Sequence, residues 1–383
     1  MNTIHQVTQI LKNPVLELPK ARKNGDFPVF LEQVFIDFFD LAIALEKFLG
    51  NDFSRRIEQS KTLSNSIIEA WRFSRNGDPI AAYSKLDQGL NCVMGELMAM
   101  SRRHSKQVLN NQSWYRLAAW KGAESRQDMF HVPFEKSQQS GYRFCTPGRP
   151  TLYLANSVYL CWLECGQPAE EKCVVSRFEI DSAGMDFLDL PCNHQAYIAP
   201  LDFPELPGFT HDPRKVMNSP FVEDVFSELA DYLMVWPLLA AISVRKSSNN
   251  QPPEYVLPQL LMLWVAQSKS LLGIRYFTSK EDKSTNSQDW SVNLAIPTRT
   301  KKDAGFCDFL LARTTCTLPQ KLSIIKDKSA EELITQKTGD RRQHAQGRYM
   351  IVTPDRGMEH YIDTVYGKME YWLDRADIEI AKI

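Results

Sequence analysis

The feature that most constrains the fold is a change in hydrophobic periodicity near residue 110. Before it, apolar side chains recur every three or four residues over long segments, which is the spacing of helices that bury one face. After it, short runs rich in branched and aromatic residues, such as 151–155 and 173–180, alternate with turn residues and indicate strands. The sequence therefore predicts a helical domain over residues 1–110 and a second, strand-containing domain over 111–383.

Local signals give approximate element positions. In the first domain, helices are predicted from Asp26–Pro28 to Gly50, over 52–75, and after Pro79. Residues 181–219 hold prolines and aromatics in no regular period, so they are interpreted as a long loop. The later segments are predicted as helices at 220–236, 254–267 and 358–374 and as strands at 273–279, 309–312 and 349–352.

Composition excludes several classes of function. The formal net charge is -1, from 45 basic and 46 acidic side chains, so no nucleic-acid or anionic-membrane partner is indicated. The longest apolar run, Tyr232–Ile242, contains a proline and is shorter than the roughly 20 residues that span a bilayer. Eight cysteines without a visible secretory signal fit a reducing compartment, so a cytoplasmic location is expected.

A metal site is not expected. Four cysteines and a histidine lie close together in the sequence, but no CxxC pair occurs among them, and reduced buried thiols fit the spacing better. These residues are Cys161, Cys165, Cys173, Cys192 and His194.

The densest group of functional side chains lies between residues 129 and 164. Arg143, Tyr153 and Glu164 supply a cation, an aromatic ring and a carboxylate, the groups needed to hold a diphosphate, face a nicotinamide ring and stabilise a ribosyl cation. Each also has a structural interpretation: an ion-paired arginine, a strand core aromatic and half of a buried salt bridge. No Gly-rich dinucleotide loop, phosphate-binding loop, zinc-protease or nucleophile-elbow motif occurs in the chain.

Over roughly residues 112–300, the chain resembles the RES family, which is related to ADP-ribosyltransferases and named for its arginine, glutamate and serine. The resemblance rests on an ordered series of motifs. They are the Tyr115–Arg116 pair, Arg143–Phe144, the Gly-x-Pro-x-Leu-Tyr-Leu-Ala-x-Ser run from Gly148 to Ser157, Glu164 at the start of a helix, the strand Gly273–Ser279, and the following Asn293 and Pro297. The family serine falls on Thr278, with Ser279 beside it, so the hydroxyl is kept although the residue differs.

The resemblance implies an ADP-ribosyltransferase-like α+β fold and NAD as substrate, with no separate cofactor. The candidate catalytic residues are Arg116, Arg143, Tyr153, Glu164 and Thr278, and the candidate substrate-binding residues are Tyr115, His131, Ser157, Ser279 and Asn293. Two of the candidate substrate-binding residues also have a structural interpretation: Ser157 could cap the following helix, and His131 could have a purely structural role.

The expected function is cleavage of the nicotinamide–ribose bond of NAD by a glycohydrolase or phosphorylase, in a toxin or anti-phage effector that depletes NAD. Two alternatives remain open: an ADP-ribosyltransferase that modifies a macromolecule, and a non-catalytic NAD-binding module. The resemblance also implies an antitoxin or another regulatory protein as partner. The N-terminal helices would regulate the enzyme or carry partner contacts, and a homo-oligomer is expected.

Overall fold

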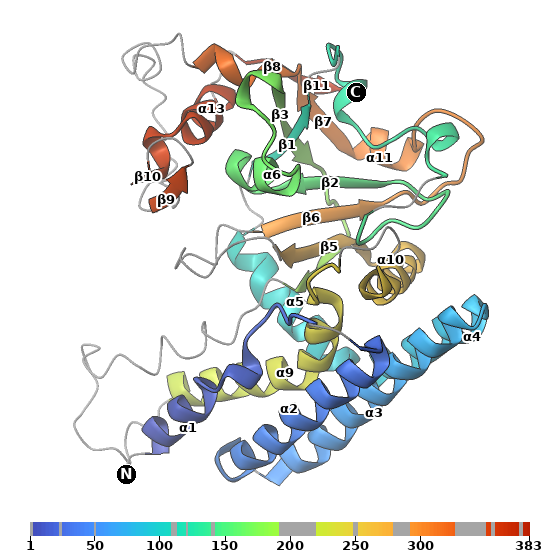
Figure 1. The fold of residues 1–383 in the computed structure, drawn as a ribbon, viewed down its shortest axis with the longest axis vertical. Coiled ribbons are helices and arrows are strands. Elements are labelled where there is room, and N and C mark those ends of the chain that lie inside the picture. The colour runs from blue at the N-terminus through green and yellow to red at the C-terminus, as the bar shows by residue number, and fades with distance from the viewer. Residues whose placement is uncertain are drawn as a thin grey trace. The chain divides into compact units, whose positions relative to one another are not determined.

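The computed structural model describes residues 3–22, 25–49, 51–108, 113–119, 122–138, 142–190, 220–247, 252–278, 292–325, 350–353, 357–374 and 378–383. The chain divides into two compact units, which are described separately below (Figure 1). Unit 1 comprises Met1–Ser105, Gly141–Phe144 and Leu188–Trp264, and unit 2 comprises Lys106–Ser140, Cys145–Phe187 and Val265–Ile383. The predicted α+β architecture with a helical N-terminal region is confirmed. The first break lies close to the predicted boundary at residue 110, but residues 188–264 group with the N-terminal helices.

Unit 1 is helical because long apolar stripes repeat at helical spacing. The helices lying wholly or mainly in it are α1 (Thr3–Leu11), α2 (Phe27–Leu49), α3 (Asn51–Arg75), α4 (Pro79–Cys92), α5 (Met94–Val108), α9 (Pro220–Ser243) and α10 (Val256–Gln267). The predicted helices at 28–50 and 52–75 are confirmed, whereas the third is divided at Val93 into α4 and α5. Asp78 caps α4 by accepting a hydrogen bond from Ala81 N at 2.9 Å.

Close packing holds the helices of unit 1 together. A Cβ added at Gly89 of α4 would lie 2.6 Å from Ser66 Cβ of α3, so these helices approach more closely than a larger residue would allow. The rings of Phe38 and Trp236 stack at 4.3 Å between α2 and α9. Ser60 Oγ of α3 also donates to the Met234 carbonyl of α9 at 2.9 Å. These contacts place α9 among the N-terminal helices despite its distance in sequence.

Helix α9 also explains the longest apolar run of the chain. Residues Asp224–Ser243 have a mean hydropathy of 1.5 and would be long enough to cross a bilayer, but 83% of that window is buried within the protein. The run Tyr232–Ile242 therefore lies in the buried C-terminal half of a core helix.

In the described residues, nine strands form one sheet in the order β11-β7-β3-β1-β2-β6-β5-β4, with β8 pairing to β3. Its strands are β1 (Trp114–Ala119), β2 (Thr151–Ala155), β3 (Cys173–Ile180), β4 (Asp186–Leu190), β5 (Leu271–Phe277), β6 (Val292–Pro297), β7 (Thr314–Thr317), β8 (Gln320–Lys321) and β11 (Ile380–Lys382). The pairs β1–β2, β1–β3, β2–β6 and β5–β6 at its centre are antiparallel. A separate two-stranded hairpin is formed by β9 (Met350–Thr353) and β10 (Gly357–His360).

The sheet has an apolar cluster on each face. One face, called here the α6 face, carries Tyr115, Leu117 and Ala155 against helices α6 (Val158–Glu164) and α13 (Val365–Leu373). The other, called the opposite face, carries Trp114, with Leu152 and Leu154 of β2, against a loop that includes Phe130 and Phe134. Successive strand residues point to opposite faces, so neighbouring motif residues separate into two environments.

Three predicted elements differ from the structure. Residues 309–312 were predicted as a strand but lie in helix α11 (Asp308–Arg313), because a short apolar run does not distinguish a strand from a buried helical turn. Only part of the predicted helix 358–374 is helical, since β10 precedes α13. Within the predicted loop 181–219, residues 181–185 are a loop, Asp186–Leu190 form strand β4, and residues 191–219 lie outside the described part of the chain.

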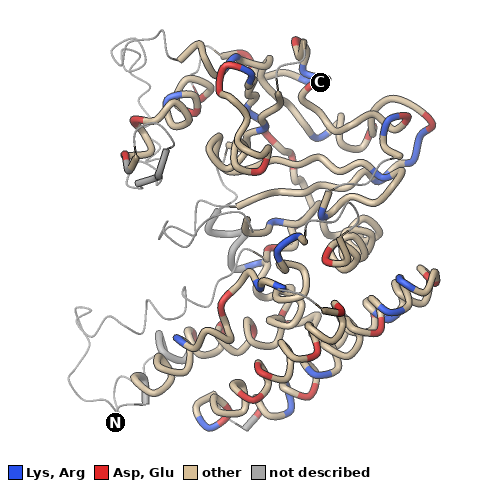
Figure 2. The backbone as a smooth tube through the Cα atoms, in the orientation of Figure 1, with Lys and Arg blue, Asp and Glu red and all other residues tan. Residues whose placement is uncertain are grey.

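Charged residues of both signs are mixed along the described parts of both units. Figure 2 shows Lys and Arg interspersed with Asp and Glu along the helices and around the sheet. This distribution agrees with the formal net charge of -1.

Candidate functional site

Helix α6 places Glu164 beside the central strands. Ser157 stands at the N-cap of α6, where its hydroxyl accepts a hydrogen bond from Leu160 N at 3.1 Å, and its side chain is fully buried. The helix runs for seven residues and ends at Glu164, followed by Gly166 with a φ of 82°. Glu164 therefore ends the helix, whereas the sequence motif predicted it at the start of one.

Three predicted site residues that are far apart in sequence meet at the Glu164 carboxylate. Its Oε1 atom accepts hydrogen bonds from Thr278 Oγ1 at 2.7 Å and from Asn293 Nδ2 at 2.9 Å. Thr278 and Asn293 are 6% and 3% exposed, whereas Glu164 is partly accessible to solvent. Two neutral donors thus hold the carboxylate in one orientation while part of it still reaches solvent.

Two tyrosines share the face of the sheet on which this cluster lies. In the register of β2 and β6, Ala155 lies opposite Asn293 and Tyr153 lies opposite Ala295. Tyr276 of β5 lies opposite Asn293 on its other side. Directly opposed residues point to the same face, so half-buried tyrosines from β2 and β5 flank the strand that carries Asn293.

Tyr115 lies on the α6 face but takes part in a separate polar network. Its hydroxyl donates to Asp374 Oδ2 at 3.2 Å, and Asp374 also accepts from Ser113 and Arg177. Burial and, secondarily, the Asp374 charge raise the pKa of Tyr115 well above its usual value. The ring is 2% exposed, so Tyr115 contributes to packing as well as to any ligand contact.

Glu370 of α13 is a buried carboxyl at the other end of α6. It is 3% exposed, and its Oε1 atom accepts from Val158 N at 2.6 Å and from the Tyr361 hydroxyl. Burial raises the pKa of Glu370 to about 8, although both hydrogen bonds act in the opposite direction. Helix α6 is therefore held by carboxyl groups at both ends: Glu370 at its first residue and Glu164 at its last.

Arg116 and His131 lie on the opposite face. Arg116 alternates along β1 with Trp114 and Ala118, which pack against that face, and its charge contributes to lowering the pKa of His131. His131 is 1% exposed; its Nε2 atom accepts from Cys307 N at 3.0 Å, so Nδ1 carries the proton that faces the Val132 carbonyl. Burial is the main cause that lowers the pKa of His131 to about 4. The ring is therefore a neutral structural link.

Arg143 belongs to unit 1, where it holds the end of a helix. Its guanidinium donates to the carbonyls of Ile242 at 2.7 Å and Val244 at 3.0 Å, and it lies 5.1 Å from the ring centroid of Tyr255. The last carbonyls of a helix have no partner within the helix, and an arginine can satisfy them. A role of Arg143 as a diphosphate clamp stays a prediction, and it would require these contacts to be exchanged for phosphate oxygens.

Ser279, Cys192 and His194 lie outside the described residues. Within the described ranges, no group of three or more His, Cys, Asp or Glu side chains could hold a metal ion. The described thiols of the cysteine-rich segment face carbonyls instead: Cys161 Sγ lies 3.2 Å from the Tyr115 carbonyl and Cys165 Sγ lies 3.5 Å from that of Leu117.

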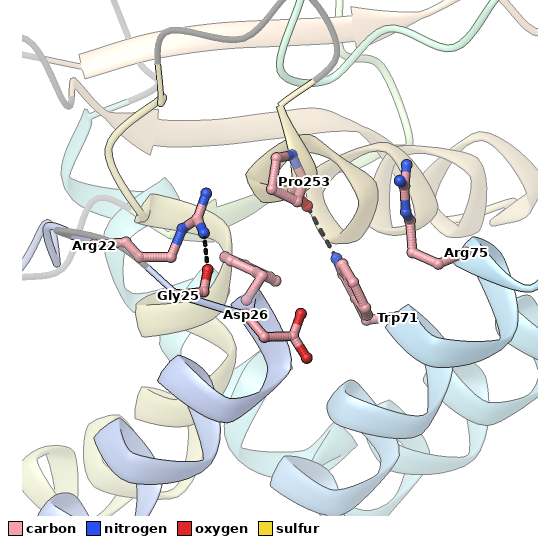
Figure 3. Close-up of a pocket in the computed structure, with 7 residues that line it drawn as sticks. Arg22, Gly25, Asp26, Trp71, Arg75 and Pro253 are labelled. Carbon is pink, nitrogen blue, oxygen red and sulfur yellow. Dashed lines mark hydrogen bonds between the residues drawn. The ribbon is translucent and has the colours of Figure 1, made fainter.

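A cavity of about 270 Å³ lies in unit 1 (Figure 3). Trp71, whose indole N–H donates to the Pro253 carbonyl at 3.0 Å, forms one wall, and Arg22, Arg75 and Asp26 contribute charges. Arg22 is ion-paired to a buried carboxylate, Glu254, at 2.9 Å. Opposite charges thus offset one another, and none of the predicted site residues lines this cavity. It is not the site that the motifs predict.

Sequence reasoning missed two residues of the α6 face. Tyr276 was part of the Gly273–Ser279 motif, so its position opposite Asn293 could have been inferred from strand alternation. Glu370 had no signal, because it lies more than two hundred residues from the helix that it caps. Only the folded chain brings them together.

Comparison with known proteins gives one relative. The chain is 28% identical over 304 residues to the Bacillus subtilis (strain 168) protein named "Putative toxin YopC". The matched region covers 77% of this chain and 66% of that protein, so the chain spans just under two thirds of its relative's length. No protein-family model and no solved structure matches the chain.

Proposed function

We propose that this protein is a toxin that cleaves the nicotinamide–ribose bond of NAD, and that Glu164 is its catalytic carboxylate. The observation that carries the proposal is the convergence of Glu164, Thr278 and Asn293 at hydrogen-bond distance. Thr278 and Asn293 lie 114 and 129 positions after Glu164 in the sequence. The resemblance to the RES family selects all three residues. Independent motifs that meet at a partly exposed carboxylate support a site rather than a chance arrangement.

The surroundings of Glu164 fit cleavage of an N-glycosidic bond. The bond between the ribose carbon and the nicotinamide nitrogen breaks, and both electrons leave with nicotinamide, which neutralises its ring nitrogen. Positive charge grows on the ribose, and a fixed carboxylate that binds a ribose hydroxyl stabilises that charge most in the transition state. Thr278 and Asn293 fix the carboxylate before the reaction, so little reorganisation is needed. Water then adds to the ribosyl cation and releases a proton; phosphate is the alternative acceptor.

The tyrosines on the same face can supply the wall for the leaving group. Tyr153 and Tyr276 flank the strand of Asn293, and both are partly exposed. An aromatic ring can stack on the planar nicotinamide at a modest gain in free energy, about 1 kcal/mol. We assign the nicotinamide wall to Tyr153, with Tyr276 as its neighbour.

The toxin role rests on the relative. A protein of Bacillus subtilis that carries the word toxin in its name matches more than three quarters of this chain. A cytoplasmic enzyme that depletes NAD would arrest the growth of its own cell. We therefore propose that an antitoxin or another regulatory protein restrains it.

The decisive experiment compares Glu164→Gln with Glu171→Gln, a matched change at an exposed carboxylate in the 3-10 turn Glu170–Lys172 that precedes β3. Purified wild-type protein should release nicotinamide from NAD, and Glu164→Gln should lower kcat by about 100-fold or more while NAD affinity and melting temperature change little. Glu171→Gln should match the wild type. In cells, induction of the wild type should lower NAD and stop growth, and Glu164→Gln should do neither.

Two outcomes would end or redirect the proposal. Normal cleavage by a folded Glu164→Gln variant would remove Glu164 from catalysis, and absence of NAD turnover by the wild type with and without phosphate would remove the activity itself. Appearance of ADP-ribose on a macromolecule, with little free ADP-ribose, would instead identify a transferase.

A further inference from the structure

Helix α2 carries an exposed apolar stripe with a seven-residue repeat. Val29, Ile36 and Ile43 are 58%, 54% and 51% exposed. They are three of the eight large hydrophobic side chains that are exposed in the described part of the chain. The core side of the same helix is occupied by other residues, including Leu31, Phe38 and Leu45, each at most 1% exposed. The stripe therefore lies on the solvent side of unit 1, where a 3.6-residue helix keeps residues seven apart nearly in line.

A second, polar row runs beside the stripe at the same repeat. Asp26 immediately precedes α2, and Gln33, Asp40 and Lys47 follow at intervals of seven; all four are exposed. Residues four apart on a helix are neighbours, so Val29 is adjacent to Gln33, and Ile36 is adjacent to Asp40. The apolar stripe runs from Val29 to Ile43, and the polar row runs from Asp26 to Lys47. Together they form one surface that is about two helical turns longer than the stripe alone.

The order of charges in the polar row is self-complementary. When a second copy of the row is laid antiparallel, Asp26 meets Lys47, Gln33 meets Asp40, and each pair occurs twice. The same arrangement, within the rise of one residue (about 1.5 Å), sets Ile36 against Ile36 at the centre and Val29 against Ile43 on either side. Apolar residues thus face apolar residues, and opposite charges face each other, as in an antiparallel helix pair.

We propose that α2 is a homodimer interface in which two copies of the chain pair their α2 helices antiparallel about a two-fold axis at Ile36. A two-fold interface needs one patch that is complementary to itself, and the two rows of α2 meet that condition. Only three apolar residues per copy are buried, so the dimer is reversible, with a dissociation constant on the order of micromolar. The interface involves unit 1 alone and does not depend on the activity of the other unit.

The test is sedimentation velocity over a concentration series from about 1 to 100 µM, with thermal melting as a check on folding. The wild type should pass from monomer to dimer over this range. Ile36→Asp should raise the dissociation constant at least tenfold without lowering the melting temperature, because Ile36 is not part of the core. Ile80→Asp, at a residue that is 82% exposed on α4 and away from the stripe, should dimerise as the wild type does.

Charge exchange tests the antiparallel order. Lys47→Asp should weaken the dimer by placing carboxylates opposite each other, and the double variant Asp26→Lys with Lys47→Asp should restore it by reversing both pairs. A wild type that stays monomeric throughout the series would overturn the proposal. So would a dimer that Ile36→Asp leaves intact, or a double variant as weak as the single one.

Discussion

The two faces of the central sheet use polar residues in different ways. On the α6 face, Thr278 and Asn293 direct side-chain donors at the carboxylate of Glu164, which remains partly exposed. On the opposite face, His131 is enclosed by Phe130 and other rings, and it accepts a backbone N–H. A polar group that gathers other side chains near solvent can act on a ligand, whereas one that completes a buried backbone bond serves the fold. Candidate residues that look equivalent in the sequence therefore differ in role.

The largest expected effect concerns Glu370, whose neighbourhood also contains Tyr361, Tyr115 and Asp374. Its folded pKa of about 8 lies above the ordinary value of 4.5, so the folded state binds the proton more tightly than the unfolded state. The stability that this group contributes is complete below about pH 4.5 and is lost as pH rises through 8, by an amount on the order of 5 kcal/mol. Thermal melts from pH 5 to 9 should show this loss, and Glu370→Gln should remove it. Parallel pH dependences for the two proteins would contradict the assignment.

His131→Ala should destabilise the protein by about 3 kcal/mol, because Cys307 N loses its acceptor inside an aromatic cluster and a cavity remains. Denaturant unfolding measures the change, with His360→Ala as a control at an exposed histidine. The folded His131→Ala fraction should cleave NAD with an unchanged KM. If His131→Ala instead raised the KM for NAD and left stability unchanged, His131 would be a substrate contact. Polar residues on the two faces of the sheet would then not differ in role.

Arg143 extends the comparison to unit 1. Arg143→Ala should lower stability by about 2 kcal/mol, since the carbonyls of Ile242 and Val244 lose a charged donor. Arg55→Ala, which removes only an exposed ion pair with Asp52, should cost less than about 1 kcal/mol. Isothermal titration calorimetry of NAD binding to the folded variants separates the two roles. An unchanged affinity of Arg143→Ala for NAD would show that Arg143 does not bind the diphosphate.

The smallest expected effect is at Thr278. Thr278→Val keeps the shape but removes the hydroxyl that donates to Glu164, so kcat should fall about tenfold, or about 1.4 kcal/mol, with little change in KM. Thr278→Ser keeps the donor and should retain most of the activity. If both variants lose activity equally, the hydroxyl is not what orients the carboxylate.

Much of the fold could be predicted because periodicity is a local property. The long helices α2 and α3 follow from apolar stripes between Gly and Pro signals, and the strands at 151–155 and 173–180 follow from their branched residues. The motif glycine at 273 also has a local reason: a Cβ there would lie 2.5 Å from the Ala295 carbonyl of the neighbouring strand. The strand predicted at 309–312 was wrong, because a run of four apolar residues fits either a strand or a helical turn.

The residue types available to the site, and their order along the chain, can be read directly from the sequence. Which of these residues contact one another depends on the tertiary structure. Strand pairing brought Asn293 beside Ala155, α6 carried Glu164 to it, and strand alternation sent Arg116 to the other face. Arg143 lies at the end of α9, because helix carbonyls without partners accept hydrogen bonds from a cation. Contacts across more than a hundred residues depend on register and packing, and no local pattern encodes them.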